Sequence, residues 1–207
     1  MDSVFDIKDN MERVKTILED PKITTVRLVL NPEKMVIKET MRAYTYLCLY
    51  NKNVEALVVN RVLPEAAAEG GFFQDKLKEQ EENMSLIHSA FDPMVIKTCE
   101  MMKTELRGLD KLNKMADMIY GDENPIMVYS DESPMSFDGS DGDYSLTLSM
   151  PFVDGKDVEL FRIDAATLMV HVGSQKRNIL LPDVLKDAEL SGADFKDNKL
   201  IIRFKRD

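Results

Sequence analysis

The sequence of 207 residues has little of several residue types on which enzyme sites often depend. It contains no tryptophan, two histidines and two cysteines, Cys48 and Cys99. These cysteines are too far apart in the sequence for a zinc-binding Cys-x-x-Cys motif or a disulfide framework. Neither a G-x-x-x-x-G-K-[ST] loop nor a G-x-G-x-x-G turn occurs. We therefore expect no catalytic residue, no metal site and no loop of its own to hold a triphosphate with Mg²⁺.

Positive charge and long apolar runs are also scarce. Lys and Arg number 27 against 37 Asp and Glu, which gives a formal net charge of -10. Because phosphate backbones select basic surfaces, we expect no nucleic-acid partner. No apolar run approaches the roughly 20 residues of a membrane-spanning helix, and residues 1–20 are acidic and amphipathic, unlike a signal peptide. The sequence predicts a cytoplasmic protein without direct membrane insertion.

The composition changes near residue 121. Ten of the 14 methionines precede Gly121, whereas six of the nine glycines lie at or after it. Gly121 followed by Pro125 is typical of a helix end and a linker. We therefore predict two domains, at residues 1–121 and 125–207.

The first domain has the pattern of an α/β fold. Apolar, β-branched runs at 24–30 and 54–60 predict buried strands, and apolar residues at helical spacing predict a helix over 32–48 between them. A strand, a helix and a strand within about 37 residues predict a βαβ unit with parallel strands. Apolar stripes predict further helices over 73–91 and 109–119.

The second domain has the pattern of an all-β fold. Apolar and polar residues alternate over 144–150, 168–172 and 200–204, and Asp-Gly or Gly-Ser pairs separate the runs. Short strands at this spacing predict an antiparallel β-sandwich of about 80 residues.

Asn60 is the strongest candidate for a binding residue. It ends a predicted parallel strand, and the carboxyl ends of such strands line ligand crevices. Its amide can donate and accept hydrogen bonds at the edge of a purine base, although an Asn here can equally cap the next turn. For Asn31 and Glu33 we favour the interpretation that they cap the helix that follows them. Glu105 and Arg107 form either a functional loop or a pair of solvated charges before the last helix.

The methionine-rich stretch allows two interpretations. Methionine serves on adaptable hydrophobic binding surfaces, but core packing is its more common role. The residues concerned are Met94, Met101, Met102, Met115 and Met118.

Four segments of the first domain together resemble the C-terminal half of the anion-transporting ATPases. They are TVRLVLNPEKM at 25–35, ETMR at 39–42, LVVNRVLP at 57–64 and ELRGLDKL at 105–112. The family includes arsenical pump-driving ATPases and ATPases that target tail-anchored membrane proteins. The resemblance implies an α/β domain with part of a P-loop NTPase-type parallel sheet.

The second domain resembles the small heat-shock-protein, or alpha-crystallin-like, sandwich that is appended to some prokaryotic members. The segments that carry this resemblance are YSLTLSMP at 144–151, LMVHVG at 168–173, Lys176, Arg177, Leu181, Pro182, Ala193 and LII at 200–202. The resemblance implies an all-β alpha-crystallin-like sandwich after the α/β domain.

The family resemblance also implies roles for individual residues. Asn60 matches the residue that contacts the adenine base, and Glu105 and Arg107 belong to a loop on the same side of the base. Glu100 stands where the family has a proline that helps wall the adenine pocket. Asn31 and Glu33, in turn, match a segment near the dimer cleft of the family.

The resemblance implies a truncated or split family member that keeps the base-recognising half and an appended sandwich. The family hydrolyses ATP with Mg²⁺ in a cycle of oxyanion export or membrane-protein targeting, but its P-loop and switch segments precede the matched region. We therefore expect this chain to be inactive alone and to bind ATP and Mg²⁺ tightly only with a P-loop-containing partner.

Such a partner, or a second copy of the chain, would bind at the exposed edge of the sheet, and a membrane transporter or an apolar client would complete the cycle. The alternative is a non-enzymatic, chaperone-like module that binds peptides through its methionine-rich helices and a strand edge. A third interpretation is a gene remnant without function.

Overall fold

The computed structural model describes residues 2–69 and 71–206, with side chains from residue 6 onward. The chain forms two compact units. The parallel-sheet unit comprises Thr25–Thr40 and Val54–Asp131, and the sandwich unit comprises the remaining described residues. None of the helices in the described part of the chain could span a membrane.

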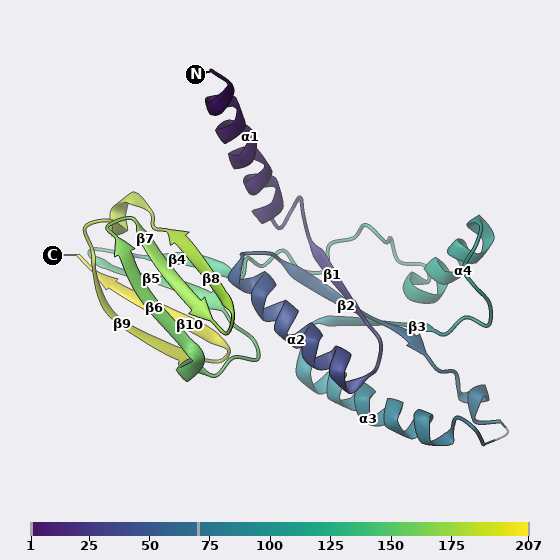
Figure 1. Ribbon diagram of the computed structural model, residues 1–207. Helices are drawn as coiled ribbons and strands as arrows, with labels where there is room; N and C mark the ends of the chain where they lie inside the picture. Colours follow the sequence, from purple (N-terminus) through teal and green to yellow (C-terminus); the bar gives the residue numbers. More distant parts are fainter. Residues whose placement is uncertain (1, 70, 207) are drawn as a thin grey trace. The chain divides into compact units, whose positions relative to one another are not determined.

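The parallel-sheet unit contains three strands in the order β1-β2-β3, and both neighbouring pairs are parallel. Its elements are β1 (Val26–Leu30), the start of α2 (Lys34–Leu49), β2 (Val54–Val62), η1 (Glu65–Ala68), α3 (Gln74–Phe91), β3 (Val95–Glu100) and α4 (Leu109–Tyr120). Figure 1 shows the start of α2 and the whole of α3 on the same side of this sheet. The parallel strands and all three helices expected between residues 32 and 119 are confirmed.

Strand β3 is an element of the parallel-sheet unit that the sequence pattern did not predict. Its residues alternate only weakly in polarity, with Lys97 and Thr98 beside Ile96, and methionines flank it on both sides. The pairing with β2 nevertheless runs in regular parallel register from Val95 to Thr98. The methionine-rich stretch therefore contains a strand as well as helix α4.

Strand β1 is less buried than expected, because Leu30 is buried, Val26, Arg27 and Leu28 are half-buried, and Val29 is exposed. Val29 is 63% exposed, although its partner in the neighbouring strand, Val58, is only 6% exposed. Because β1 is an end strand with one neighbour in the described sheet, its side chains depend on cover from elsewhere. The expectation of a buried strand over residues 24–30 is wrong at Val29.

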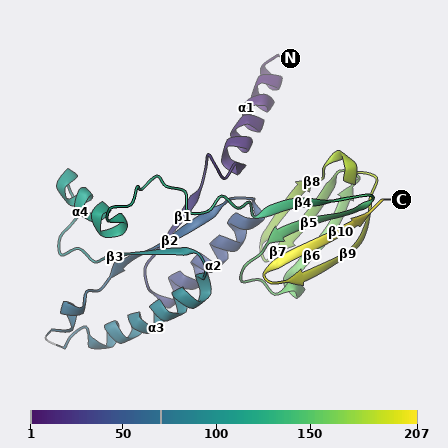
Figure 2. The ribbon, with the colours of Figure 1, turned by 180° about the vertical axis from the view of Figure 1, so that it is seen from behind.

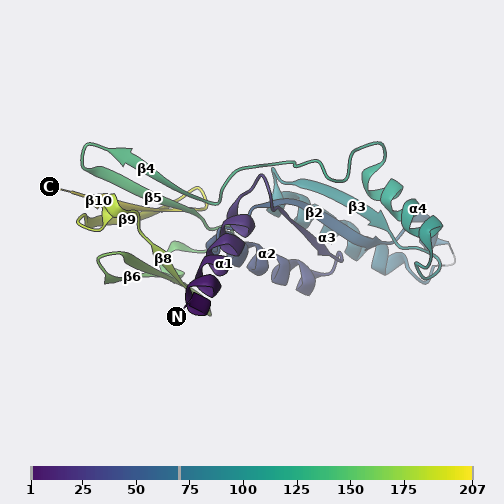
Figure 3. The same ribbon diagram turned by 90° about the horizontal axis from the view of Figure 1, so that it is seen from above.

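The sandwich unit contains two antiparallel sheets, in the orders β4-β5-β10-β9 and β6-β7-β8. Its strands and short helices are β4 (Met135–Ser140), β5 (Asp143–Ser149), η2 (Gly155–Asp157), β6 (Val158–Asp164), β7 (Thr167–Val172), β8 (Gln175–Leu180), η3 (Asp183–Leu185), β9 (Glu189–Lys196) and β10 (Lys199–Lys205). Figure 3 shows the two sheets as separate layers. The expected β-sandwich is confirmed.

The sandwich core is apolar and draws on both sheets. Alternate residues of the strands point inward, as the period-2 pattern predicts. The fully buried side chains include Leu146, Leu148, Leu168, Val170 and Ile202.

The end of α2 belongs to the sandwich unit. Leu49 has no exposed surface and is part of the sandwich core. The guanidinium of Arg177 on β8 donates a hydrogen bond to the carbonyl oxygen of Leu49 and lies 5.8 Å from the ring centre of Tyr50. Arg177 also pairs with Glu19 at the end of α1 (Asp2–Glu19), at 3.5 Å. Residues before 121 therefore help to build the sandwich unit.

Candidate functional site

A groove of about 720 Å³ lies at the carboxyl ends of β2 and β3, inside the parallel-sheet unit. Its walls come from Asn60 and Arg61 of β2, from the segment 99–106 that continues β3, and from Met115 of α4. This is the edge at which open α/β sheets bind ligands, because loops rather than helices close it.

The carboxamide of Asn60 has a fixed orientation at the groove. The backbone N–H of Arg61 donates a hydrogen bond to Asn60 Oδ1 at 2.9 Å. A backbone N–H can only donate, so the contacting atom is the oxygen and the amide nitrogen Nδ2 remains available. In the described part of the chain, no acceptor is recorded for Nδ2. The two interpretations of Asn60 are therefore compatible, because its oxygen caps the turn while its nitrogen can serve a ligand.

The walls beside Asn60 are rich in methionine. Met101, Met102 and Met115 line the groove, whereas Met118 packs on the sheet. Met118 Sδ lies 3.7 Å from Cys99 Sγ and accepts a hydrogen bond from the backbone N–H of Glu100 at 3.1 Å. Three of the methionines thus lie on the groove and Met118 contacts the end of β3, while a binding role for the methionines stays a prediction.

The loop before α4 brings Glu105 to the groove but not Arg107. Glu105 lines the groove and pairs with Arg107 at 2.7 Å, and both side chains are largely exposed. Lys111 of α4 holds this loop by donating to Thr104 Oγ1 and to the carbonyl oxygen of Glu105, each at 2.9 Å. Arg107 is not among the residues that line the groove, but its ion pair with Glu105 connects it to the groove wall.

A second groove, of about 250 Å³, adjoins the first at the carboxyl ends of β1 and β2. Arg61 and Met101 line both grooves. The side chain of Gln80 on α3 fixes the backbone here, because it accepts from Leu63 N at 2.7 Å and donates to Leu63 O at 3.1 Å. The other residues of the second groove are Asn31, Pro32, Glu33, Phe73, Lys76 and Glu79.

Glu33 lies at the start of α2. Its carbonyl oxygen accepts the first helical hydrogen bond, from Ile37 N at 2.9 Å, which confirms a capping position. Its carboxylate, like Asn31, reaches the second groove.

The first groove combines the carboxamide of Asn60 and three thioethers with charged side chains, among them Glu100, Lys103 and Glu105. No group of three or more His, Cys, Asp or Glu side chains within the described ranges is placed to hold a metal ion. A carboxamide donor between thioether walls matches a planar ring that carries hydrogen-bond acceptors.

Comparison with known protein families agrees with both parts of the fold. A family described as anion-transporting ATPase matches residues 1–121, and a domain described as the HSP20-like domain found in ArsA matches residues 141–204. The chain belongs to the anion-transporting ATPase family.

The curated members of this family include proteins named as arsenical pump-driving ATPases. The chain is 36% identical over 204 residues to one from Chlorobaculum tepidum and 33% identical over 197 residues to one from Aquifex aeolicus. These matches cover 99% and 94% of the chain, but 50% of each relative. The ATPase GET3C of Arabidopsis thaliana is 29% identical over 116 residues, which cover 55% of the chain and 30% of that protein. The chain thus spans about half the length of the first two relatives.

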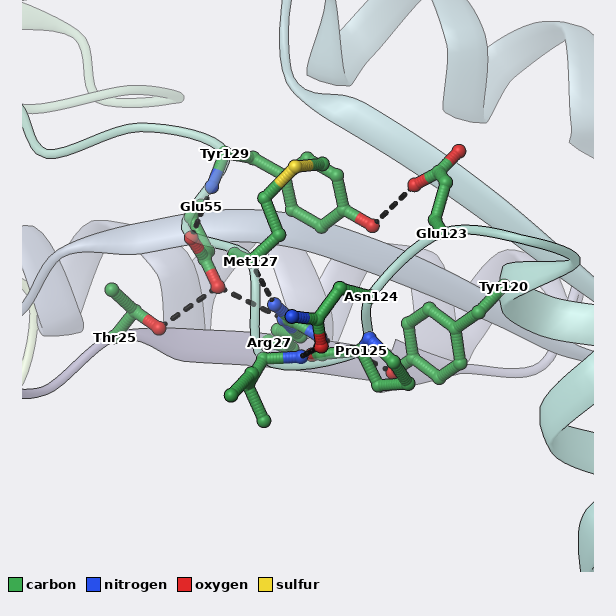
Figure 4. A network of polar contacts seen from close by, with 10 residues as sticks. Thr25, Arg27, Glu55, Tyr120, Glu123, Asn124, Pro125, Met127 and Tyr129 are labelled. Carbon is green, nitrogen blue, oxygen red and sulfur yellow. Dashed lines mark hydrogen bonds and ion pairs between the residues drawn. The ribbon is translucent and has the colours of Figure 1, made fainter.

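In this ATPase family member, the sequence analysis missed a buried polar network in the parallel-sheet unit (Figure 4). The carboxylate of Glu55 on β2 has no exposed surface and accepts hydrogen bonds from Thr25 Oγ1 at 2.8 Å, Arg27 Nε at 2.9 Å and Tyr129 N at 2.7 Å. Burial raises the pKa of Glu55, but the hydrogen bonds from Tyr129, Thr25 and Arg27 outweigh it, so the pKa lies below its usual value. A lone glutamate in an apolar strand was the available signal.

The same network fixes the segment after α4 on the sheet. Arg27 donates to the carbonyl oxygens of Pro125 and Met127, both at 2.6 Å, and lies 5.1 Å from the ring centre of Tyr129. Figure 2 shows this segment running beside β1 and β2. We name residues 125–129 the strap, and none of them is among the residues that line the two grooves.

Proposed function

We propose that the groove beside Asn60 binds the purine base of ATP. The observation that carries the proposal is the convergence of Asn60, Glu105 and three methionines on one groove at the carboxyl ends of parallel strands. Nδ2 of Asn60 would donate to a ring nitrogen of the base, and the methionine side chains would contact its faces.

In this proposal, the chain supplies base recognition to the ATP-dependent cycle of the anion-transporting ATPases. The phosphates and Mg²⁺ are held by a P-loop-containing segment, since the 207 residues include no such motif. Phosphoryl transfer depends on positioning by that loop and the metal ion, so this chain does not catalyse it alone.

The partner that brings the P-loop would pair with an end strand of the sheet, β1 or β3, each of which has one strand neighbour in the described structure. A second copy of the chain is the other candidate for this position. In the cytoplasm, the cycle would drive oxyanion export or membrane-protein targeting, through a membrane transporter or an apolar client.

Nucleotide titration tests the proposed base site. We expect the chain to bind adenosine weakly, to bind ATP more tightly when a P-loop-containing family protein is added, and to show no ATPase turnover alone. Asn60→Ala should raise the Kd for adenosine about tenfold, which corresponds to about 1.4 kcal/mol. The matched control is Asn178→Ala, an exposed position on β8, which should leave the Kd unchanged. Equal Kd values for the two variants would contradict the base site.

A second function, binding of an apolar client, is favoured by one observation on α1. Its residues Ile7, Met11, Val14 and Leu18 follow helical spacing, are between 43% and 68% exposed, and line one shallow groove. Apolar stripes of this kind mark interaction surfaces. Met11→Lys should abolish binding of a fluorescent apolar peptide and leave adenosine binding intact.

A further inference from the structure

The sheet β6-β7-β8 forms one layer of the sandwich (Figure 3), and one of its faces points away from the core. Side chains alternate between the two faces along each strand, and the inward ones include Leu168 and Val170 of the buried core cluster. The outward ones include Phe161, Ile163 and Leu180, which are 47%, 53% and 69% exposed. We name the outward-pointing residues of these three strands the outer face. Large apolar side chains gathered on one exposed surface mark an interaction site.

The register of the strands arranges the outer face in three rows that cross the sheet from β6 through β7 to β8. The rows, from the first to the third, are Glu159-His171-Lys176, Phe161-Met169-Asn178 and Ile163-Thr167-Leu180. The third row contains the register shift of β6 between Arg162 and Asp164. Charge therefore lies at one end of the outer face, and the aliphatic pair Ile163 and Leu180 lies at the other.

The first row carries opposite charges at its two ends. The carboxylate of Glu159 lies 2.8 Å from His171 Nδ1 and is largely exposed. Lys176 stands two strands farther, about 10 Å across the sheet, and its ammonium group forms no ion pair within the described residues. A partner that neutralises this row must therefore offer a cation over β6 and an anion over β8.

We propose that this partner is a second copy of the chain, bound face to face through the outer face with the two-fold axis along β7. Such an axis places β6 of each copy over β8 of the other. Glu159 then faces the second copy's Lys176, and the same contact repeats on the other side of the axis, as a two-fold interface requires. An apolar client would leave both charges without counter-charges.

The same axis matches the rest of the outer face. Ile163 faces the second copy's Leu180, so the two most exposed aliphatic side chains of the face cover each other twice in the dimer. In the second row, Met169 faces its own copy, and Phe161 faces the second copy's Asn178. The inference is independent of the base site, whose residues belong to the parallel-sheet unit.

The size of the outer face sets the expected strength of association. Strands β7 and β8 have six residues each, so a face of three such strands measures about 15 Å by 20 Å. An interface of this size belongs to the small class that forms transient complexes. We therefore expect a dimer that dissociates at micromolar concentrations.

The test is a dilution series of the full chain at low salt, followed by light scattering or sedimentation velocity. Glu159→Lys and Lys176→Glu each place like charges opposite one another at two positions, so each variant alone should raise the dimer Kd about tenfold. An equimolar mixture of the two variants should recover the Kd of the unaltered chain, because every opposed pair then again joins a Lys to a Glu. Leu180→Ser should weaken the dimer without changing its response to salt.

The matched controls are Glu189→Lys and Lys196→Glu, which make the same charge changes at exposed positions of β9 in the other sheet. They should change the Kd by less than about twofold. All the substituted charges are exposed, so the variants should keep the thermal unfolding of the unaltered chain.

Three results would overturn the proposal. A chain that stays monomeric up to about 1 mM, or variants that shift no more than their controls, would show that the outer face is not an interface between copies. A mixture that stays dissociated would show that Glu159 and Lys176 do not face each other. A dimer that responds to Val29→Thr but to none of these variants would pair through β1 instead.

Discussion

The two sheets of the sandwich surround a shared apolar core, whereas the parallel-sheet unit has a single sheet whose end strand β1 leaves Val29 63% exposed. The buried cluster of the sandwich consists of apolar side chains, and Arg177, which pairs with Glu19, donates to the carbonyl oxygen of Leu49 beside it. The parallel sheet instead holds its cover, the strap, through the buried carboxylate of Glu55 and the guanidinium of Arg27. A buried ion pair stabilises the fold only while each of its members is present, because removing one leaves the other charge buried without a partner.

The candidate binding site lies in the parallel-sheet unit and not in the sandwich unit. Both grooves lie at the carboxyl ends of the strands of the parallel sheet, and its end strands β1 and β3 each have one strand neighbour in the described structure.

The largest expected effect is at Glu55. Glu55→Ala leaves Arg27, Thr25 and the backbone N–H of Tyr129 without their acceptor, and removing one member of a buried ion pair costs about 3–5 kcal/mol. Hydrogen exchange should show the loss in β1, β2 and the strap. The control, Glu79→Ala, breaks an exposed pair and should cost about 0.5 kcal/mol or less. A loss below about 1 kcal/mol at Glu55 would mean that the strap is not held by this network.

The next effect is in the sandwich, at Leu49. Leu49→Ala should cost about 3 kcal/mol, because it leaves a cavity in the core. The control on the same helix, Met35→Ala, changes a side chain that is 79% exposed and should cost little. Thermal unfolding measures both. The excised segment 125–207 should still unfold cooperatively, but at a lower temperature than the sandwich of the full chain, since it lacks Leu49.

The two units should also differ in their response to pH. The lowered pKa of Glu55 contributes stability above its usual value of 4.5, and this stability is lost as the pH falls below that value toward the folded-state pKa. Acid should therefore weaken the parallel-sheet unit first. Glu55→Gln should flatten the acid limb of the stability profile for this unit.

Alkali should act on the sandwich unit, which contains Cys48. Burial raises the pKa of this thiol from 9.0 to about 12, although a hydrogen bond with Tyr44 acts in the other direction. The neutral thiol stabilises the fold below pH 9, and this contribution is lost between pH 9 and 12 at up to about 1.4 kcal/mol per pH unit. Cys48→Ala should remove most of the alkaline dependence, as measured by urea unfolding at pH 7 and 10.5. An unchanged alkaline limb would show that the thiol is not the group responsible.

The sequence predicted elements with a strong period and missed residues whose role depends on distant contacts. Strand β2 and helix α3 follow from their apolar patterns, and the resemblance singled out Asn60 and Glu105, which the structure brings to one groove. Strand β3 has no clear period, so only its pairing with β2 reveals it. Leu49 looks like any apolar residue at the end of a helix, and its place in the sandwich core depends on strands about 100 residues later in the chain.

The smallest expected effect is at Val29, and it decides whether the parallel sheet is open. Val29 and Val58 are register partners on neighbouring strands and share a face of the sheet, but only Val58 is buried. Val58→Thr should cost about 1–3 kcal/mol, because it buries a hydroxyl, whereas Val29→Thr should stay within about 0.5 kcal/mol in the isolated chain. Equal costs in urea unfolding of the monomer would show that β1 is already covered. If a P-loop-containing partner or a second copy covers β1, Val29→Thr should instead weaken association, seen by light scattering as a shift of the dilution midpoint to higher concentration. A monodisperse monomer at every concentration, with or without the partner, would contradict pairing at this end of the sheet.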